Sequence, residues 1–242
     1  MKVVAIMQAR MGSTRLPGKV LLDLAGKPML GRDMNRLARA DTLAQVVVAT
    51  TVEPADDAIV DLCEDRDWSY FRGSEEDVLD RYYRVAKAQE ADVVVRITSD
   101  CPLIEPQVVD QVVSAFLERQ PELDYASNTA PERTFPRGLD TEVMHFDALE
   151  RAWREDDNPA WREHVTPYIR RHPELFESYG VLNDDDLSRM RWTVDTPEDL
   201  AFVRCIYEHF GHDKFSWREV LTLLEKYPEW LAINRDIKQK HI

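Results

Sequence analysis

Short apolar runs alternate with longer amphipathic stretches over the first half of the chain. Runs at 2–7, 46–50 and 92–98, with a shorter one at 69–72, fit strands that are buried inside a sheet. The stretches that follow carry apolar residues at helical spacing, at 28–40, 55–64, 74–86 and 106–117. Ser74 is expected to open the third helix, with Asp77 as its capping-box partner. This alternation predicts an α/β fold, with a mostly parallel sheet and helices on both faces.

The pattern becomes irregular between 121 and 190, where six prolines interrupt the chain. The elements predicted from there on are a hairpin at 139–146, helices at 147–155 and 160–171, a strand at 191–194, a helix from Thr196 and a tail helix at 216–226. We therefore expect a single Rossmann-like domain over 1–242. Its core comprises 1–120 and 190–215, with an insertion or lid at 121–189 and a helical tail at 216–242.

Composition narrows the classes of function. The 242 residues are 44% hydrophobic and 31% charged, which predicts a globular protein. A net charge of −14 argues against binding to duplex nucleic acid or to an anionic membrane. The N-terminal apolar run is too short for a signal peptide, and no run reaches the ~20 residues of a membrane helix. Three widely spaced cysteines without a C-x-x-C pair suit a reducing compartment, so we expect a cytoplasmic protein.

The loop after the first predicted strand contains several residues of the types that bind phosphate. Gly12 and Gly18 allow close backbone approach, and exposed N–H groups in such a turn can form an anion nest. The loop also carries hydroxyl and cationic side chains that suit phosphate, namely Arg10, Ser13, Thr14, Arg15 and Lys19. It is not a Walker A loop, because five residues separate the glycines and Val20 follows the lysine. A plain surface connection is the alternative, but three cations in so acidic a chain favour a polyphosphate ligand.

Two aspartates directly follow predicted strands. Asp100 comes after the run at 92–98, and Asp195 after the run at 191–194. Parallel strands would bring both carboxylates to the edge of the sheet that carries the phosphate loop. Thr196 and Asp199 can form the cap of the next helix, which leaves Asp195 without a structural role. Because one or two carboxylates with substrate phosphates commonly hold Mg²⁺, the pair predicts a magnesium site, although Asp100 could also belong to an ordinary turn.

The stretch at 6–19 resembles the signature of the cytidylyltransferases that activate acidic sugars, the CMP-sugar synthetases. It is most similar to the branch named for spore coat polysaccharide biosynthesis. Similar blocks cover most of the chain, at 71–74, 77–82, 96–102, 163–169 and 195–200. The resemblance implies a nucleotide-diphospho-sugar transferase fold, CTP as the nucleotide, and a homodimer formed through the region of the insertion.

The resemblance also implies roles for single residues. Arg10, Ser13 and Lys19 would hold the triphosphate, and Asp100 and Asp195 would bind Mg²⁺. The expected reaction is attack of a sugar hydroxyl on the α-phosphorus of CTP, with pyrophosphate as the leaving group. Arg10, Lys19 and Asp100 would therefore be catalytic, through charge neutralisation rather than a covalent intermediate.

The remaining candidates are assigned to the two substrates. Gly12, Thr14 and Arg15 belong to the nucleotide-binding loop, and Arg72 and Ser74 fall where such enzymes recognise the base. Residues 121–190 do not match the sugar pockets of the octulosonate and neuraminate enzymes, so the identity of the acceptor sugar stays open. The loop at 128–142, which includes Arg133, is expected to face the acceptor instead.

Three further residues are expected to face the acceptor, namely Arg137, Asp140 and His164. His164 could be a general base, although a packing role is the more common one for a lone histidine in a helix. Two other functions remain as alternatives. One is a glycosyltransferase that consumes a nucleotide sugar, and the other is a non-catalytic nucleotide-binding protein of the same fold.

Overall fold

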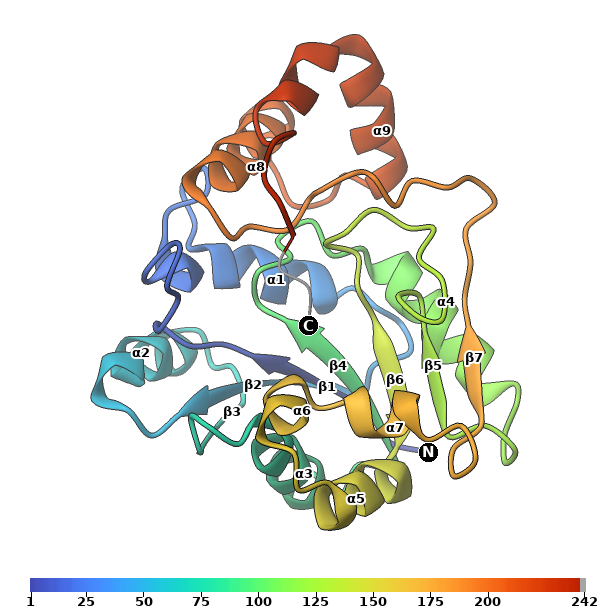
Figure 1. Ribbon diagram of the computed structural model, residues 1–242. Helices are drawn as coiled ribbons and strands as arrows, with labels where there is room; N and C mark the ends of the chain where they lie inside the picture. The colour runs from blue at the N-terminus through green and yellow to red at the C-terminus, as the bar shows by residue number, and fades with distance from the viewer. Residues whose placement is uncertain (240–242) are drawn as a thin grey trace.

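The computed structural model describes residues 1–239, which fold around one seven-stranded sheet in the order β3-β2-β1-β4-β6-β5-β7 (Figure 1). The strands are β1 (Val3–Gln8), β2 (Gln45–Thr51), β3 (Tyr70–Gly73), β4 (Val93–Thr98), β5 (Tyr125–Ser127), β6 (Glu142–His145) and β7 (Ser178–Gly180). β1 pairs in parallel with β2 and β4, β2 with β3, and β5 with β7. β6 is antiparallel to β4 and β5. The predicted α/β fold with a mostly parallel sheet is confirmed.

Helices cover both faces of the sheet (Figure 1). One face carries α1 (Met29–Leu37), α2 (Asp57–Asp65), α4 (Pro106–Leu117), α8 (Pro197–Phe210) and α9 (Trp217–Lys226). The other carries α3 (Val78–Ala88), α5 (Phe146–Glu155), α6 (Pro159–His164) and α7 (Pro167–Arg171). Three short 3₁₀ helices, η1 (Lys19–Leu21), η2 (Pro54–Asp56) and η3 (Pro228–Ala232), complete the elements of residues 1–239.

The two cores follow from the twofold periodicity of the central strands. In β1, Val3, Ala5 and Met7 pack against the α1 side, and Val4 and Ile6 pack against the α3 side. All five are at most 4% exposed. Successive side chains of a strand point to opposite faces, so a strand between two helical layers must be apolar throughout. The order of the strands then brings the ends of β1 and β4 together in the middle of the sheet.

The predicted strand at 191–194 is wrong. Arg191 forms only an isolated bridge with Arg137, and the segment joins no ladder of the sheet. Both sides of β4 are already occupied, by β1 and β6, so this segment finds no strand edge there. The backbone N–H groups of this segment find hydrogen-bond partners outside the sheet. The Trp192 N–H donates to the Arg137 carbonyl, and the Val194 N–H donates to the Asp100 carbonyl.

The irregular middle of the chain also differs from the prediction. The expected hairpin at 139–146 is the single strand β6, which pairs with β5 across the connection at 128–141. β5 and β7 were not predicted, because three residues are too few to show a period. Residues 121–189, expected to form an insertion or lid, thus supply three strands of the main sheet.

Two helix boundaries need correction as well. α3 begins at Val78 with Asp77 as its N-cap, and the Ser74 hydroxyl instead accepts a hydrogen bond from the Asp77 N–H. The expected helix at 160–171 is broken into α6 and α7 by Val165, whose φ is 69°. Within residues 1–239, no helix is long and apolar enough to cross a bilayer.

Candidate active site

The loop after β1 turns back on itself beside the end of β4. The N–H groups of Ser13 and Gly18 both donate to the Met11 carbonyl, at 2.8 and 3.0 Å. Gly18 has a φ of 68°, a left-handed conformation that glycine adopts without strain, and it leads directly into η1. The buried Asp56 carboxylate accepts from the Met11 N–H at 2.6 Å and so fixes the loop to η2. This folding places Lys19, the first residue of η1, over the tip of β4.

The ammonium of Lys19 lies between the two predicted aspartates. Its Nζ is 3.1 Å from Asp100 Oδ2 and 2.9 Å from Asp195 Oδ1. Burial lowers the pKa of Lys19, but the two carboxylates outweigh burial and raise that pKa above its ordinary value. Burial alone would raise the pKa of Asp100, yet the charge of Lys19 and a hydrogen bond from Thr98 lower it to about 2. Lys19 and Asp100 are therefore both charged at neutral pH.

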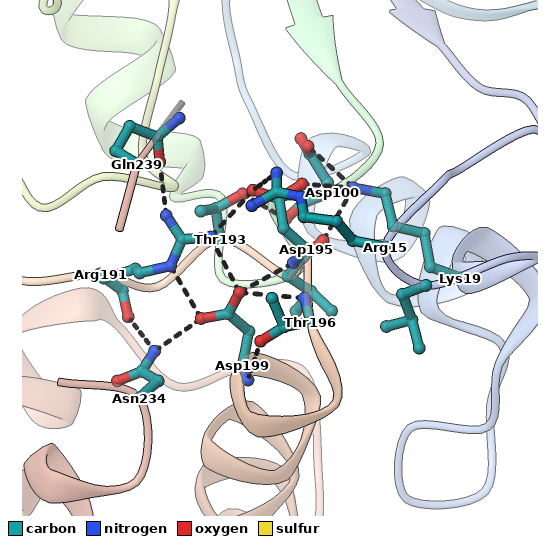
Figure 2. Close-up of polar contacts among 12 residues, drawn as sticks. Arg15, Lys19, Asp100, Arg191, Thr193, Asp195, Thr196, Asp199, Asn234 and Gln239 are labelled. Atoms are coloured by element: carbon teal, nitrogen blue, oxygen red, sulfur yellow. Dashed lines mark hydrogen bonds and ion pairs between the residues drawn. The ribbon is translucent and has the colours of Figure 1, made fainter. Parts of the chain in front are cut away.

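Asp195 is held from several directions (Figure 2). Besides Lys19, its carboxylate pairs with Arg15 at 3.0 Å and with Arg191 at 2.9 Å. The predicted capping box of α8 is present, since the Thr196 side chain accepts from the Asp199 N–H and Asp199 accepts from the Thr196 N–H. The prediction that both aspartates reach the edge of the phosphate loop is confirmed, although the segment before Asp195 is not a strand.

A pocket of about 240 Å³ opens beside Lys19, and we call it the loop pocket. Its lining includes most of the predicted nucleotide and metal residues, namely Arg10, Gly12, Ser13, Thr14, Arg15, Lys19, Asp100 and Asp195. Arg10 is 41% exposed, with its nearest carboxylates on Glu75 and Glu163 at 3.4 and 3.8 Å. Three cations of the loop thus line this pocket together with the carboxylates of Asp100, Asp195 and Glu163, and the cations suit a phosphate chain.

Two side chains with buried polar atoms in this pocket were missed by the sequence reasoning. Arg81 of α3 is 1% exposed, and its Nε and Nη1 have no hydrogen-bond partner within residues 1–239. Gln8 Oε1 is likewise buried and unpaired in the described part of the chain. Burial lowers the pKa of Arg81. Because unsatisfied buried donors and acceptors cost free energy, such atoms facing a pocket indicate a ligand that pairs with them.

Arg72 and Ser74, expected near the base, do not line the loop pocket. Arg72 lies on the edge strand β3, where its side chain donates to the Thr51 carbonyl at 2.8 Å and pairs with Asp57 at 2.8 Å. The Ser74 hydroxyl accepts from the Asp77 N–H before α3. The structure therefore puts Arg81, rather than these two residues, at the wall of the pocket.

A second pocket, of about 310 Å³, adjoins the first, and we call it the arginine pocket. Four arginines line it, namely Arg96, Arg133, Arg137 and Arg170, and so do the other residues expected at the acceptor, Asp140 and His164. The Arg133 guanidinium donates two hydrogen bonds to the Asp140 carboxylate, at 2.5 and 2.7 Å. Arg96 forms an ion pair with Glu142.

Besides the exposed Arg170, Arg137 is available to a ligand in the arginine pocket. No hydrogen bond or ion pair to its guanidinium is found within residues 1–239. Burial, and then the nearby charge of Arg133, lower the pKa of Arg137. A half-buried cation that lacks a carboxylate partner is suited to bind an anionic group of a ligand.

The two pockets meet at a shared wall formed by Thr98, Asp100, His164 and Asp195. His164 has a pKa lowered by burial, so its imidazole is neutral at pH 7. A ligand in the loop pocket and a ligand in the arginine pocket would therefore face each other across the aspartates. This arrangement suits transfer of a group between two bound molecules.

The shared wall also fits a divalent cation. Within residues 1–239, no cluster of three or more His, Cys, Asp or Glu side chains could hold a metal ion. Asp100 and Asp195 nevertheless converge on one ammonium, within 3.1 Å of its nitrogen. Two convergent carboxylates completed by phosphate oxygens are a usual way to hold Mg²⁺, so the donor set is adequate when a phosphate ligand is present.

Known proteins that resemble this chain include cytidylyltransferases and a protein of polysaccharide biosynthesis. A family model described as cytidylyltransferase matches residues 4–229. The spore coat polysaccharide biosynthesis protein SpsF of Bacillus subtilis is 32% identical over 237 residues, which cover 94% of this chain and 95% of that protein. The 3-deoxy-manno-octulosonate cytidylyltransferase of Trichlorobacter lovleyi is 39% identical over 119 residues, which cover 48% of this chain and 46% of the relative.

A solved structure resembles the whole chain. The structure of a cytidylyltransferase from Leptospira borgpetersenii superposes with a TM-score of 0.92 at 36% identity, with full coverage of both chains. The fold, including β5 and β7, which the sequence pattern did not predict, is thus shared with that protein.

Proposed function

The chain belongs to the cytidylyltransferase family, and on that basis we propose that it transfers CMP from CTP to a hydroxyl group of an acidic sugar, releasing pyrophosphate, for synthesis of a surface polysaccharide. The observation that carries this proposal is that two pockets, each lined by several cationic side chains, meet at Asp100 and Asp195. Relatives named as a 3-deoxy-manno-octulosonate cytidylyltransferase and as a spore coat polysaccharide biosynthesis protein support the acceptor class and the pathway.

In the loop pocket the phosphate chain of CTP would lie along the loop after β1. Arg10, Ser13 and Lys19 offer charged and hydroxyl donors to its oxygens, and Gly12 lets the backbone approach closely. Lys19 and Arg15 now pair with aspartates, so a phosphate would replace one anionic partner by another. Arg10 and Lys19 would then stabilise the negative charge that develops on pyrophosphate as it leaves.

The unpaired atoms of Arg81 and Gln8 support cytosine as the base. Cytosine presents a carbonyl oxygen and a ring nitrogen as acceptors, next to an exocyclic amine as donor. Arg81 can donate to the acceptors, and Gln8 Oε1 can accept from the amine. Uracil carries an N–H at that ring nitrogen, and so would present a donor where the guanidinium of Arg81, which can only donate, needs an acceptor.

The chemistry is an in-line displacement at the α-phosphorus. A sugar hydroxyl in the arginine pocket forms the new P–O bond, and the bond from the α-phosphorus to the bridging oxygen breaks. The hydroxyl proton must leave during attack. His164 lines both pockets with a neutral imidazole, so a ring nitrogen can accept that proton. Asp100 and Asp195 would hold Mg²⁺, whose charge offsets that of the phosphates when it is bound.

Arg137 is proposed to bind the carboxylate of the sugar. Replacing Arg137 by Gln should raise the KM for a 3-deoxy-keto-acid sugar by about tenfold or more, because a charge-assisted pair is lost. The KM for CTP should stay within about twofold, since the loop pocket does not include Arg137. The measurement is steady-state pyrophosphate release with CTP, Mg²⁺ and the sugar.

The matched control is Arg189→Gln, which removes an exposed arginine from the loop before Arg191. It should behave like the wild type. Equal KM values for the acidic sugar in Arg137→Gln and wild type would refute the assigned carboxylate site. A glycosyltransferase, the main alternative, would consume a nucleotide sugar and release a free nucleotide. Absence of pyrophosphate from every CTP and sugar mixture would therefore refute the proposed reaction.

Two further properties belong to the proposal. The chain is expected to act in the cytoplasm, which agrees with three free cysteines in residues 1–239 and with the supply of CTP there. It is also expected to form a homodimer, an expectation that comes from the family resemblance.

A further inference from the structure

The last described residues of the chain return to the site. After α9 and η3, the segment at 233–239 runs back from the outer helices toward the tip of β4 (Figure 1). Its final described residue, Gln239, lines the arginine pocket. We call residues 234–239 the C-terminal strap. The strap belongs to the same side of the sheet as Asp100 and Asp195, although it begins 39 positions after Asp195 along the chain.

The strap contacts one residue of the site, Arg191, at two points. The Asn234 side-chain amide donates to the Arg191 carbonyl at 3.0 Å and to Asp199 Oδ1 at 2.9 Å. At the other end of the strap, Gln239 Oε1 accepts a hydrogen bond from Arg191 Nη1 (Figure 2). Asn234 is 5% exposed, so the first contact is buried.

Arg191 distributes its donors over three partners. Its Nε and Nη2 bind the two oxygens of Asp199 at 2.8 Å, and its Nη2 also binds Asp195 Oδ2 at 2.9 Å. With Nη1 on Gln239, the guanidinium is held at every nitrogen. A planar guanidinium fixed in this way has one orientation, and that orientation sets where the Asp195 carboxylate is held.

The importance of Arg191 grows when a triphosphate binds. Arg15 and Lys19, the other two cations on Asp195, line the loop pocket and are proposed to turn to phosphate oxygens. Arg191 does not line the loop pocket and its side chain is only 10% exposed, so it keeps its place. It would then be the remaining fixed cation that positions Asp195.

From this we propose that the C-terminal strap is a positioning element of the active site: Gln239 and Asn234 orient Arg191, and Arg191 holds Asp195 in place for the bound nucleotide and its metal. Gln239 also completes the wall of the arginine pocket. The proposal rests on the proposed function, because it assigns the strap to the same reaction. It makes Gln239 a positioning residue, which acts through Arg191.

The test compares three full-length variants with the wild type. Gln239→Met keeps the size of the side chain but removes the acceptor for Arg191 Nη1. Gln239→Glu restores an acceptor oxygen at the same place. Lys238→Met is the matched control, because it changes the neighbouring exposed side chain, which contacts neither Arg191 nor Asp199 in residues 1–239.

Two measurements separate a positioning role from a purely structural one. The first is pyrophosphate release as a function of Mg²⁺, CTP and sugar concentration. The second does not depend on turnover: Mn²⁺ binding in the presence of CTP, followed by paramagnetic resonance. Partners that orient a metal ligand typically affect affinity or activity by about tenfold. Gln239→Met should therefore weaken Mn²⁺ binding and lower kcat by about tenfold, with the KM for CTP nearly unchanged.

Gln239→Glu should recover most of both losses, and Lys238→Met should match the wild type. Wild-type Mn²⁺ affinity and kcat in Gln239→Met would overturn the proposal, and so would an equal loss in Lys238→Met. Failure of the proposed function has a different signature, because the wild type itself would then release no pyrophosphate. The Mn²⁺ measurement would still test the strap in that case.

Discussion

Substitution of Gly138 tests whether the connection between β5 and β6 must lie close to the segment that leads to Asp195. Gly138 lies in this connection, lines the arginine pocket and has a φ of 110°. A Cβ atom placed on it would lie 2.7 Å from the Trp192 carbonyl carbon and 2.9 Å from the Thr193 nitrogen. These are backbone atoms, so they cannot turn aside as a flexible side chain would. Gly138→Ala must therefore push apart the connection and the segment that leads to Asp195.

The cost has two parts. A non-glycine residue held at such a φ is strained by about 1–3 kcal/mol. Forcing extra atoms into a packed region adds about 1–3 kcal/mol more through backbone shifts. We expect Gly138→Ala to lower the free energy of unfolding by about 3 kcal/mol. Gly211→Ala is the matched control, because Gly211 has a φ of 69° and a Cβ there would meet nothing within 4 Å. It should cost about 1 kcal/mol, from the left-handed backbone alone.

Urea unfolding of both variants, followed by far-UV circular dichroism, measures these free energies. The same preparations should be assayed for pyrophosphate release. Because Thr193 is two residues from Asp195, Gly138→Ala should also lower kcat by about tenfold or more, and Gly211→Ala should leave it unchanged. If the two variants unfold at the same urea concentration with equal kcat, the close approach does not constrain the site and the reasoning is refuted.

Two more predictions concern charges in the site. The pKa of Asp100 is lowered to about 2, from an ordinary 3.8, so its charge stabilises the fold above pH 4 and loses that effect as the pH falls through about 2. The difference in unfolding free energy between wild type and Asp100→Asn should thus shrink by up to about 2 kcal/mol between pH 5 and 2, and a constant difference would contradict the shift. Arg81→Met, which removes a buried unpaired cation, should raise stability without nucleotide by about 1 kcal/mol or more and weaken CTP binding in calorimetry by at least about tenfold. Arg84→Met, on the exposed side of α3, is its control, and unchanged CTP affinity in Arg81→Met would exclude Arg81 from base binding.

The core of the fold was predictable because it depends on local patterns. The apolar runs of β1, β2 and β4 are long enough to show their period, and the helices between them carry clear apolar stripes. β5 and β7 have three residues each and gain their stability from neighbouring strands rather than from their own sequence. The break at Val165 is similar, since nothing in a β-branched residue predicts a positive φ.

The convergence of Asp100 and Asp195 was predicted correctly for an incomplete reason. The expectation assumed that 191–194 is a strand parallel to β4. The structure shows instead a segment tied to the turn after β4, where the Val194 N–H and the Thr193 hydroxyl both donate to the Asp100 carbonyl. The two aspartates meet because the Asp100 carbonyl is hydrogen-bonded to the two residues that precede Asp195. Sequence spacing indicates that a residue follows an element, but it does not indicate which groups satisfy the backbone there.

Residues whose role depends on distant partners could not be found in this way. Arg81 stands within the apolar stripe of α3, between Val78 and Tyr82, and a charge at such a position is a usable signal of a buried site. Arg191 and Gln239 give no such signal. Their importance comes from contacts across 48 positions of the chain, which only the folded structure brings together.

The charge arrangement of the site explains how an acidic chain can bind a triphosphate. With no ligand, Lys19 is largely buried and paired with Asp100 and Asp195, and the partly exposed Arg15 is paired with Asp195. A bound triphosphate would exchange their carboxylate partners for phosphate oxygens, so these cations need not be stripped of water again. The released carboxylates would then be free to bind a divalent cation, while Arg191 keeps Asp195 in place. Nucleotide and metal should accordingly bind with positive coupling. The phosphates would pair with the cations that leave the aspartates, and the metal would pair with the aspartates themselves.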